Sequence, residues 1–430
     1  MISDVEALEK RARSVCQLKE NVDSMANLRR ALEREHDLER RWLHYVSAQS
    51  PPAATGDSIS EGKDHFSSAV PKDLKIHSRP LRPGETRLLI LLPAPETYYP
   101  LLCTLEIHTW EGGSRPKYAA LSYFWGPDVC NGRLYLVRDR LEDDLNNPDD
   151  WGYAARYATR IPIRNNLFRA LLRLRRRYHR VALWVDIVCI DQQNWTEKTE
   201  QLGQMINVYS KAENVCVWLG ERDADGRSDE AMRFVTAIMD FAVLDRYARD
   251  RKQAKKWLAL AELMRDRWFS CRWVVQEISL ALDKATVHCG GKMVQWSDFA
   301  DAVSLLASNQ EAIKDLFDYS EWRDGPNTLG DVQSFGAYTL LEATSKLFLT
   351  TTQSETGRTK ITKHIKGLES LVTSLKTFDT SDQRDLIYSL VSIAGDVGEH
   401  AGASNGEQTQ IWMRKRADLK PDYGKKAIEV

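Results

Sequence analysis

The 430-residue sequence lacks several features that would each indicate a class of protein. Its seven cysteines are dispersed and form no CxxC pair, which argues against a disulfide framework and against a zinc site. Sixty basic and 61 acidic residues nearly cancel, so the charge balance calls for neither a nucleic-acid partner nor an anionic membrane. The N-terminus has no signal-peptide pattern, and no apolar run approaches the roughly 18 residues of a membrane span. No GxGxxG or Walker motif is present, which disfavours hydride-transfer and nucleoside-triphosphate enzymes. We therefore expect a soluble, cytoplasmic protein with no membrane span.

The composition of the chain, 43% hydrophobic and 28% charged, is that of a globular protein. Two segments of different character precede the main domain. Residues 1–46 are expected to be helical, because Leu8, Val15 and Val22 recur at sevens and begin a short heptad seam. This helix could pack on the main domain or mediate self-association. Residues 47–80 are rich in Pro, Ser, Gly and Ala and are expected to form a linker.

Residues 81–295 alternate apolar runs with amphipathic segments, which predicts an α/β core with a parallel sheet flanked by helices. We expect 119–122, 182–189 and 215–219 to be neighbouring strands, with further strands near 87–93, 102–107 and 285–289. Residues 128–159 are interpreted as an irregular insertion, after which Pro162 is expected to open a helix. Asn194 and Glu197 have the spacing of a capping box at the start of another helix. Residues 296–430 are predicted to be mostly helical, with a polar loop near 350–360.

Polar and aromatic side chains follow the predicted strands at their carboxyl ends, where parallel sheets bind ligands. The candidates there are Ser122, Tyr123, Trp125, Gly126, Asp186, Asp191, Gln192, Gly220 and Glu221. The stretch 267–277 adds Arg272, Trp273 and Glu277 near the same edge. Apolar walls with a few carboxylates suit a site for a small molecule.

Three of these stretches carry a resemblance to a known family. Tyr118-Ala-Ala-Leu-Ser-Tyr-Phe-Trp-Gly126, Leu183-Trp-Val-Asp-Ile-Val-Cys-Ile-Asp-Gln192 and residues 267–277 resemble the hallmark blocks of the fungal heterokaryon-incompatibility (HET) domain. Two later stretches, 382–390 and 421–423, also fit the family pattern. The resemblance covers roughly residues 81–430, in order. Because such a match usually continues past Tyr423, we expect this chain to be part of a longer protein.

The resemblance implies a fold, a reaction and one catalytic residue. HET domains trigger programmed cell death when unlike hyphae fuse, and they are similar to TIR domains, which have a flavodoxin-like parallel sheet. Many TIR domains cleave NAD⁺ when self-associated, so the resemblance implies NAD⁺ as substrate, no bound cofactor or metal, a homo-oligomer and an upstream recognition protein. By the same resemblance Glu277 would be catalytic. The expected binding residues are Ser122, Tyr123, Trp125, Gly126, Asp186, Asp191, Arg272 and Trp273.

The residues themselves leave alternatives open. A glutamate early in a helix could favour the helix dipole, or pair with Arg272, rather than act in catalysis. Asp186 lies inside an apolar run and needs a partner, which could be a structural donor or a ligand ribose. The basic run 173–180 is most simply a solvated helix face. The alternative to an NAD⁺-cleaving enzyme is a non-enzymatic recognition module that signals by assembling with partner domains.

Overall fold

The computed structural model describes residues 76–396, apart from 111–115, 128, 138–153, 156–157, 222, 224, 282, 319–324, 346, 353–358 and 381. The predicted N-terminal helix (1–46), almost all of the predicted linker (47–80) and the end of the chain after residue 396 lie outside the described residues. The sheet and helices described below all belong to one unit, made of residues 68–95 and 99–430.

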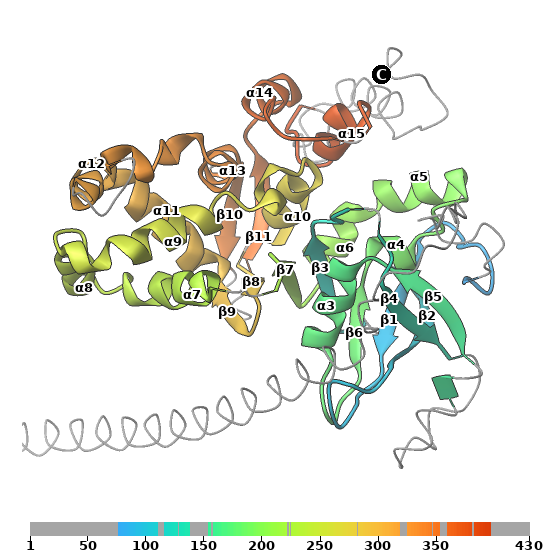
Figure 1. The fold of residues 1–430 in the computed structure, drawn as a ribbon. Helices are drawn as coiled ribbons and strands as arrows, with labels where there is room; N and C mark the ends of the chain where they lie inside the picture. Colours follow the sequence, from blue (N-terminus) through green and yellow to red (C-terminus); the bar gives the residue numbers. More distant parts are fainter. Residues whose placement is uncertain are drawn as a thin grey trace, which may run out of the picture. The chain divides into compact units, whose positions relative to one another are not determined.

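Nine strands form the main sheet, in the order β5-β4-β2-β1-β6-β3-β7-β8-β9 (Figure 1). Their bounds are β1 Glu85–Leu91, β2 Leu101–Thr109, β3 Ala119–Tyr123, β4 Gly132–Leu136, β5 Thr159–Ile163, β6 Val181–Trp184, β7 Asn214–Trp218, β8 Ala285–Cys289 and β9 Lys292–Gln295. The strands β6, β3, β7 and β8 are mutually parallel neighbours. The prediction that the segments near 119, 182 and 215 are adjacent parallel strands is therefore confirmed.

The prediction of a parallel sheet is confirmed only in part, because the sheet as a whole is mixed. β1 pairs antiparallel with both β2 and β6, and β9 pairs antiparallel with β8. Two residues, Gly290 and Gly291, join β8 to β9, and so short a connection can only reverse the chain into a hairpin. On the other side, the parallel pair of β2 and β4 is followed by β5, which runs antiparallel to β4. The four parallel neighbours β6, β3, β7 and β8 are thus one part of a wider mixed sheet.

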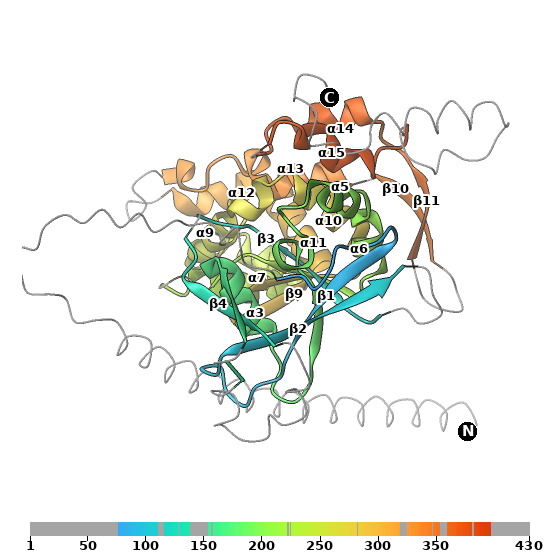
Figure 2. The same ribbon diagram turned by 90° about the vertical axis from the view of Figure 1, so that its right-hand side faces the viewer.

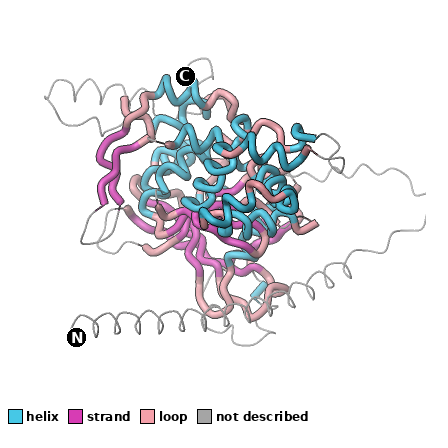
Figure 3. The backbone as a smooth tube through the Cα atoms, turned by 90° about the vertical axis from the view of Figure 1, so that its left-hand side faces the viewer, coloured by secondary structure: helices cyan, strands magenta, loops and turns pink. Residues whose placement is uncertain are grey.

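Helices account for most of the remaining described chain. The α-helices are α3 Asn165–Leu174, α4 Asp186–Cys189, α5 Trp195–Gly203, α6 Met205–Lys211, α7 Arg227–Ala237, α8 Phe241–Tyr247, α9 Ala254–Leu263, α10 Trp273–Ala281, α11 Trp296–Ser308, α12 Gln310–Lys314, α13 Gly336–Thr344, α14 Leu368–Ser374 and α15 Asp385–Val391. The 3-10 turns are η1 Arg251–Gln253, η2 Arg267–Ser270, η3 Asp315–Phe317, η4 Gly325–Thr328 and η5 Val332–Ser334. Figures 1 and 2 show α7, α9 and α11 gathered near the β8–β9 end of the sheet, and Figure 3, seen from that side, shows helices lying over the strands.

Three local predictions need correction. The apolar run after Val181 is a strand only as far as Trp184, and Asp186–Cys189 form one helical turn, because an uninterrupted apolar run does not distinguish a strand from a buried helix. The segment 128–159 contains strand β4, and Pro162 lies inside β5 rather than at a helix start. Both ends of the predicted polar loop near 350–360 are strand residues, which form the antiparallel pair β10 (Phe348–Thr352) and β11 (Thr359–His364).

The core is continuous from the sheet into the later helices. Leu89, Trp184 and Val217 of the sheet are fully buried, as are Trp268 and Phe269 of η2 and Leu340 of α13. These side chains belong to one hydrophobic cluster, which fixes η2 and α10 against the carboxyl end of the parallel strands. None of the helices in the described part of the chain has the length and apolarity that crossing a bilayer requires.

Candidate functional site

The centre of the candidate site is a hydrogen bond between the first and third sequence blocks. Ser122, near the end of β3, donates from Oγ to Oε2 of Glu277 in α10. The same Ser122 oxygen accepts a hydrogen bond of 2.9 Å from the indole Nε1 of Trp268. Ser122 and Glu277 were predicted to lie near one edge of the sheet, and the structure confirms this for the pair.

Tyr209 completes the surroundings of the Glu277 carboxyl. It lies on α6, which packs against α10, and its side chain hydrogen bonds to Glu277. Burial raises the pKa of Glu277 to about 7, the hydrogen bonds from Ser122 and Tyr209 oppose the rise, and the negative charge of Asp186 adds to it. Only 9% of Glu277 is exposed. A carboxyl in this setting exchanges its proton near neutral pH, as acid–base and charge-stabilising groups often do.

Asp186 is the second carboxyl of the site, and its partners are now identified. Its Oδ2 accepts a hydrogen bond of 2.8 Å from Nε1 of Trp125, and its Oδ1 accepts one of 2.7 Å from the backbone of Ile187. Tyr123 also hydrogen bonds to this carboxyl. Burial raises the pKa of Asp186, against the effect of these donors. The structural donors that the sequence could only postulate therefore exist.

Trp125 is the most exposed of these side chains, at 37%. One ring face is approached by the guanidinium of Arg164, whose Cζ lies 5.2 Å from the ring centroid. The turn after Trp125 depends on Gly126, which has φ of +71°, a left-handed conformation that a side chain would strain. Arg164 donates to the Gly126 carbonyl, and Asn166 donates to the carbonyl of Phe124, so the start of α3 fixes this turn.

We call Ser122, Tyr123, Trp125, Asp186, Tyr209, Trp268 and Glu277 the Glu277 site. Sequence reasoning overlooked Tyr209 and Trp268 as members. Tyr209 lies on the buried face of α6, and Trp268 lies within the third sequence block. Neither position carries a sequence signal of its role, because each side chain reaches the site only through packing of its helix.

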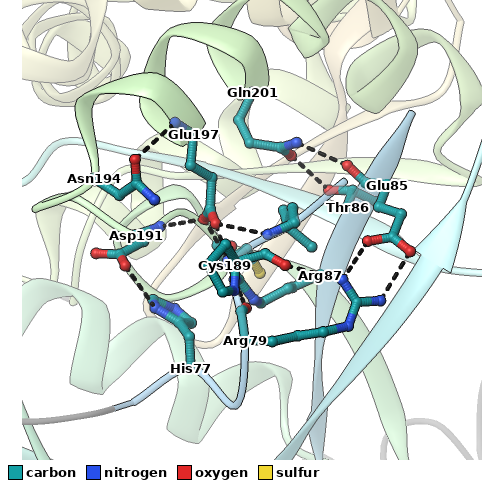
Figure 4. Close-up of polar contacts among 12 residues, drawn as sticks. His77, Arg79, Glu85, Thr86, Arg87, Cys189, Asp191, Asn194, Glu197 and Gln201 are labelled. Carbon is teal, nitrogen blue, oxygen red and sulfur yellow. Dashed lines mark hydrogen bonds and ion pairs between the residues drawn. The ribbon is translucent and has the colours of Figure 1, made fainter. Parts of the chain in front are cut away.

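Two predicted binding residues have other contacts. Arg272 is 1% exposed, and its guanidinium donates to the backbone carbonyls of Leu375 and Leu386. Among the described residues it forms no ion pair with Glu277, so that alternative for Glu277 is excluded. Asp191 lies 3.9 Å from Nδ1 of His77 and its backbone donates to Glu197, which assigns it to a different cluster of polar side chains (Figure 4). Trp273 is half-buried against the hydrophobic core.

Comparison with known proteins identifies a family for the segment that contains the site. Residues 118–277 match the family model described as heterokaryon incompatibility protein (HET), so the match begins in the segment leading to Ser122 and ends at Glu277. The chain is 25% identical over 402 residues to heterokaryon incompatibility protein 6, OR allele, of Neurospora crassa, in a match that covers 82% of this chain. It spans about half of that relative, 52% of its length. No solved structure matches the chain significantly. The resemblance to the HET family is confirmed over residues 118–277.

Proposed function

We propose that this HET domain cleaves NAD⁺ between ribose and nicotinamide, with Glu277 as the catalytic carboxylate. The observation that supports the proposal most strongly is the contact of Ser122 with Glu277. It holds a buried carboxyl with a pKa of about 7 beside the carboxyl end of β3, and the ligands of parallel sheets bind outside such ends.

The chemistry requires little more than one well-placed negative charge. The bond to nicotinamide breaks through an oxocarbenium-like transition state, in which positive charge develops on the ribose. A carboxylate held against that charge stabilises it, and more strongly in a buried site than in water. Nicotinamide leaves as a neutral pyridine and needs no proton from a second acid. Water, or a nucleophilic atom of the ADP-ribosyl group itself, then forms the new bond to the ribose carbon. Ionised Glu277 can therefore act without a partner carboxyl.

The neighbouring side chains fit the binding of a nucleotide. Trp125 offers a partly exposed aromatic surface on which a planar base could stack, and Asp186 beside it offers oxygens to ribose hydroxyls. The four parallel strands also support a TIR-like fold: numbered in chain order β3, β6, β7, β8, they lie in the order 2-1-3-4, as in flavodoxin-like sheets.

At the level of the organism, we propose a part in heterokaryon incompatibility and the cell death that follows it, on the strength of the HET match and the name of the Neurospora relative. Self-association would switch the activity on, and an upstream recognition protein would provide the trigger. The short heptad seam of residues 1–46 is one candidate contact for self-association.

A second function, recognition without catalysis, is favoured by one observation. Glu277 is only 9% exposed and already accepts hydrogen bonds from Ser122 and Tyr209, which is also what a purely structural carboxyl would do. In that case the HET domain would signal by assembling with partner domains.

The test is release of nicotinamide from NAD⁺ by the purified chain, over a range of protein concentrations. We expect Glu277→Gln to reduce the rate on the order of a hundredfold or more. Glu311→Gln is the matched control, since that side chain is 87% exposed on α12, and its rate should equal that of the unchanged protein. No nicotinamide at any concentration would favour the recognition module. Equal rates in all three proteins would remove Glu277 from the mechanism.

A further inference from the structure

Asp186 is carried by an unusually short helix. α4 consists of four residues, Asp186–Cys189, and its helical hydrogen bonds run from the backbone N–H of Cys189 to Val185 and from that of Ile190 to Asp186. The last carbonyls of a helix have no partner within it, and in one turn this applies to most of them. Side chains from elsewhere must therefore fix α4 in place.

Two of those side chains come from the strand β1 and from the segment before it, and a third comes from the connection after α4. His77 Nε2 donates to the carbonyl of Val188 at 2.9 Å, and Nη1 of Arg87 donates to the carbonyl of Cys189 at 3.1 Å (Figure 4). Gln192 donates to the carbonyl of Asp186 at 3.0 Å. The carboxyl end of α4 is thus held by residues more than 100 positions earlier in the chain.

Glu197, on α5, connects these elements. Its Oε1 accepts from Arg87 at 2.5 Å and from the backbone of Asp191 at 2.8 Å, and its Oε2 accepts from Arg87 and from the backbone of Leu81, each at 3.0 Å. Arg87 is 1% exposed and Glu197 is 4% exposed. All four acceptor positions of one buried carboxylate are occupied, by donors from β1, from the segment 77–82 and from the connection after α4 (Figure 4).

A buried ion pair contributes little net stability compared with apolar side chains of the same size, but it imposes a definite geometry on its partners. Here the partners are the two flanks of α4. At the other end of that turn, Asp186 bonds to Trp125 in the Glu277 site. A displacement of the α4 backbone would therefore change the position of the Asp186 carboxyl and the environment of the Trp125 indole.

We propose that His77, Arg87 and Glu197 are positioning residues, which set the place of Asp186 in the Glu277 site through α4. Their effect on catalysis rests on the function proposed above, whereas their effect on Trp125 does not. It also follows that the segment 77–82, where the chain enters the domain, is coupled to the site: anything that displaces this segment moves Asp186.

The test uses His77, because removing its imidazole leaves no buried charge behind. The full chain is labelled with 5-fluorotryptophan, and the ¹⁹F resonance of Trp125 is assigned as the one lost in Trp125→Phe. In His77→Ala we expect that resonance to shift and broaden. In His77→Gln, whose amide can donate to the Val188 carbonyl in place of Nε2, it should return to its original position. The KM for NAD⁺ should follow the same pattern, rising several-fold in His77→Ala and recovering in His77→Gln.

Leu306→Ala provides the control for general destabilisation, since Leu306 is fully buried on α11 and belongs neither to the Glu277 site nor to the polar contacts of His77, Arg87 and Glu197. We expect Leu306→Ala to lower the melting temperature at least as much as His77→Ala does. It should nevertheless leave the Trp125 resonance in place. An unmoved Trp125 resonance in His77→Ala, or an equal shift in Leu306→Ala, would overturn the inference. A protein without NAD⁺ cleavage would instead contradict the proposed function, and the ¹⁹F comparison would still decide the positioning role.

Discussion

Ser122 and Glu277 stand 155 positions apart in the sequence, yet the hydroxyl of the first donates to the carboxyl of the second. Trp268 donates to the same hydroxyl, so Ser122 has both a fixed donor and a fixed acceptor. The hydroxyl proton is therefore directed at Glu277. This contact joins strand β3 to helix α10 and makes the ionisation of Glu277 dependent on Ser122.

The ionisation of Glu277 should be visible in the pH dependence of stability. Its pKa is about 7 in the folded protein and about 4.5 without perturbation, a difference of about 2.5 units or roughly 3 kcal/mol at 1.36 kcal/mol per unit. Because the pKa of Glu277 is raised in the folded state, its carboxyl does not lower the free energy of unfolding below about pH 4.5. Above that pH the free energy of unfolding falls progressively, until about pH 7. Glu277→Gln has no such charge, so its stability relative to the unchanged protein should increase over this interval. Urea unfolding near pH 5 and near pH 8 measures the difference, and parallel pH profiles would contradict the assignment.

The rate of cleavage should change with pH in the opposite direction to stability: ionisation of Glu277 lowers the stability of the fold but raises the rate. If the ionised carboxylate is the active form, kcat/KM should fall about tenfold per pH unit below about pH 7 and level off above it. The hydrogen bond from Ser122 lowers the pKa of Glu277, so Ser122→Ala should move this midpoint to higher pH. Initial rates between about pH 5 and pH 9 provide the comparison. A midpoint that stays in place in Ser122→Ala would mean that another group is titrating.

Substitution of Arg272 tests whether this residue of the third block has a structural role or binds the substrate. Because its buried guanidinium donates to the carbonyls of Leu375 and Leu386, Arg272→Met should lower stability by roughly 1–3 kcal/mol. The KM of the protein that remains folded should change little. Arg265→Met is the matched control, since Arg265 also donates to a backbone carbonyl, that of Leu329, but from an exposed position. Its stability loss should be smaller. An unchanged melting temperature together with a higher KM would restore Arg272 as a binding residue.

Self-association predicts a concentration dependence. If the site is completed or ordered by contacts between copies, the specific activity should rise steeply with protein concentration rather than stay constant. A dilution series measures this, with Val15→Asp in the heptad seam as the test variant and Val22→Leu as a conservative control. A flat profile for the unchanged protein would remove self-association from the mechanism. A steep profile that Val15→Asp leaves intact would place the contact elsewhere.

The sequence by itself determined where three of the parallel strands lie. Apolar runs bounded by turn residues located β3, β7 and β8, because burial on both faces leaves a continuous hydrophobic signal. The position of Ser122 after a predicted strand, and of Glu277 near the same edge, predicted that the two residues lie close together. The sequence could not fix the direction of β1 or β9. The partner and direction of a strand depend on the route of the chain between strands and on which edge of the sheet is open for pairing.

Only the tertiary structure decided which polar side chains share a site. Arg87 stands in an apolar strand and Glu197 in the position of a capping residue, and nothing local indicates that they form one buried pair. Tyr209 hydrogen bonds to Glu277 from α6, and Trp268 joins the same site through Ser122. Arg272, five positions before Glu277, instead has its guanidinium on the carbonyls of Leu375 and Leu386. The physical reason is the same in each case. A buried polar group takes whichever partner satisfies its hydrogen bonds in the packed core, and that partner is set by how helices and strands meet in space rather than by distance along the chain.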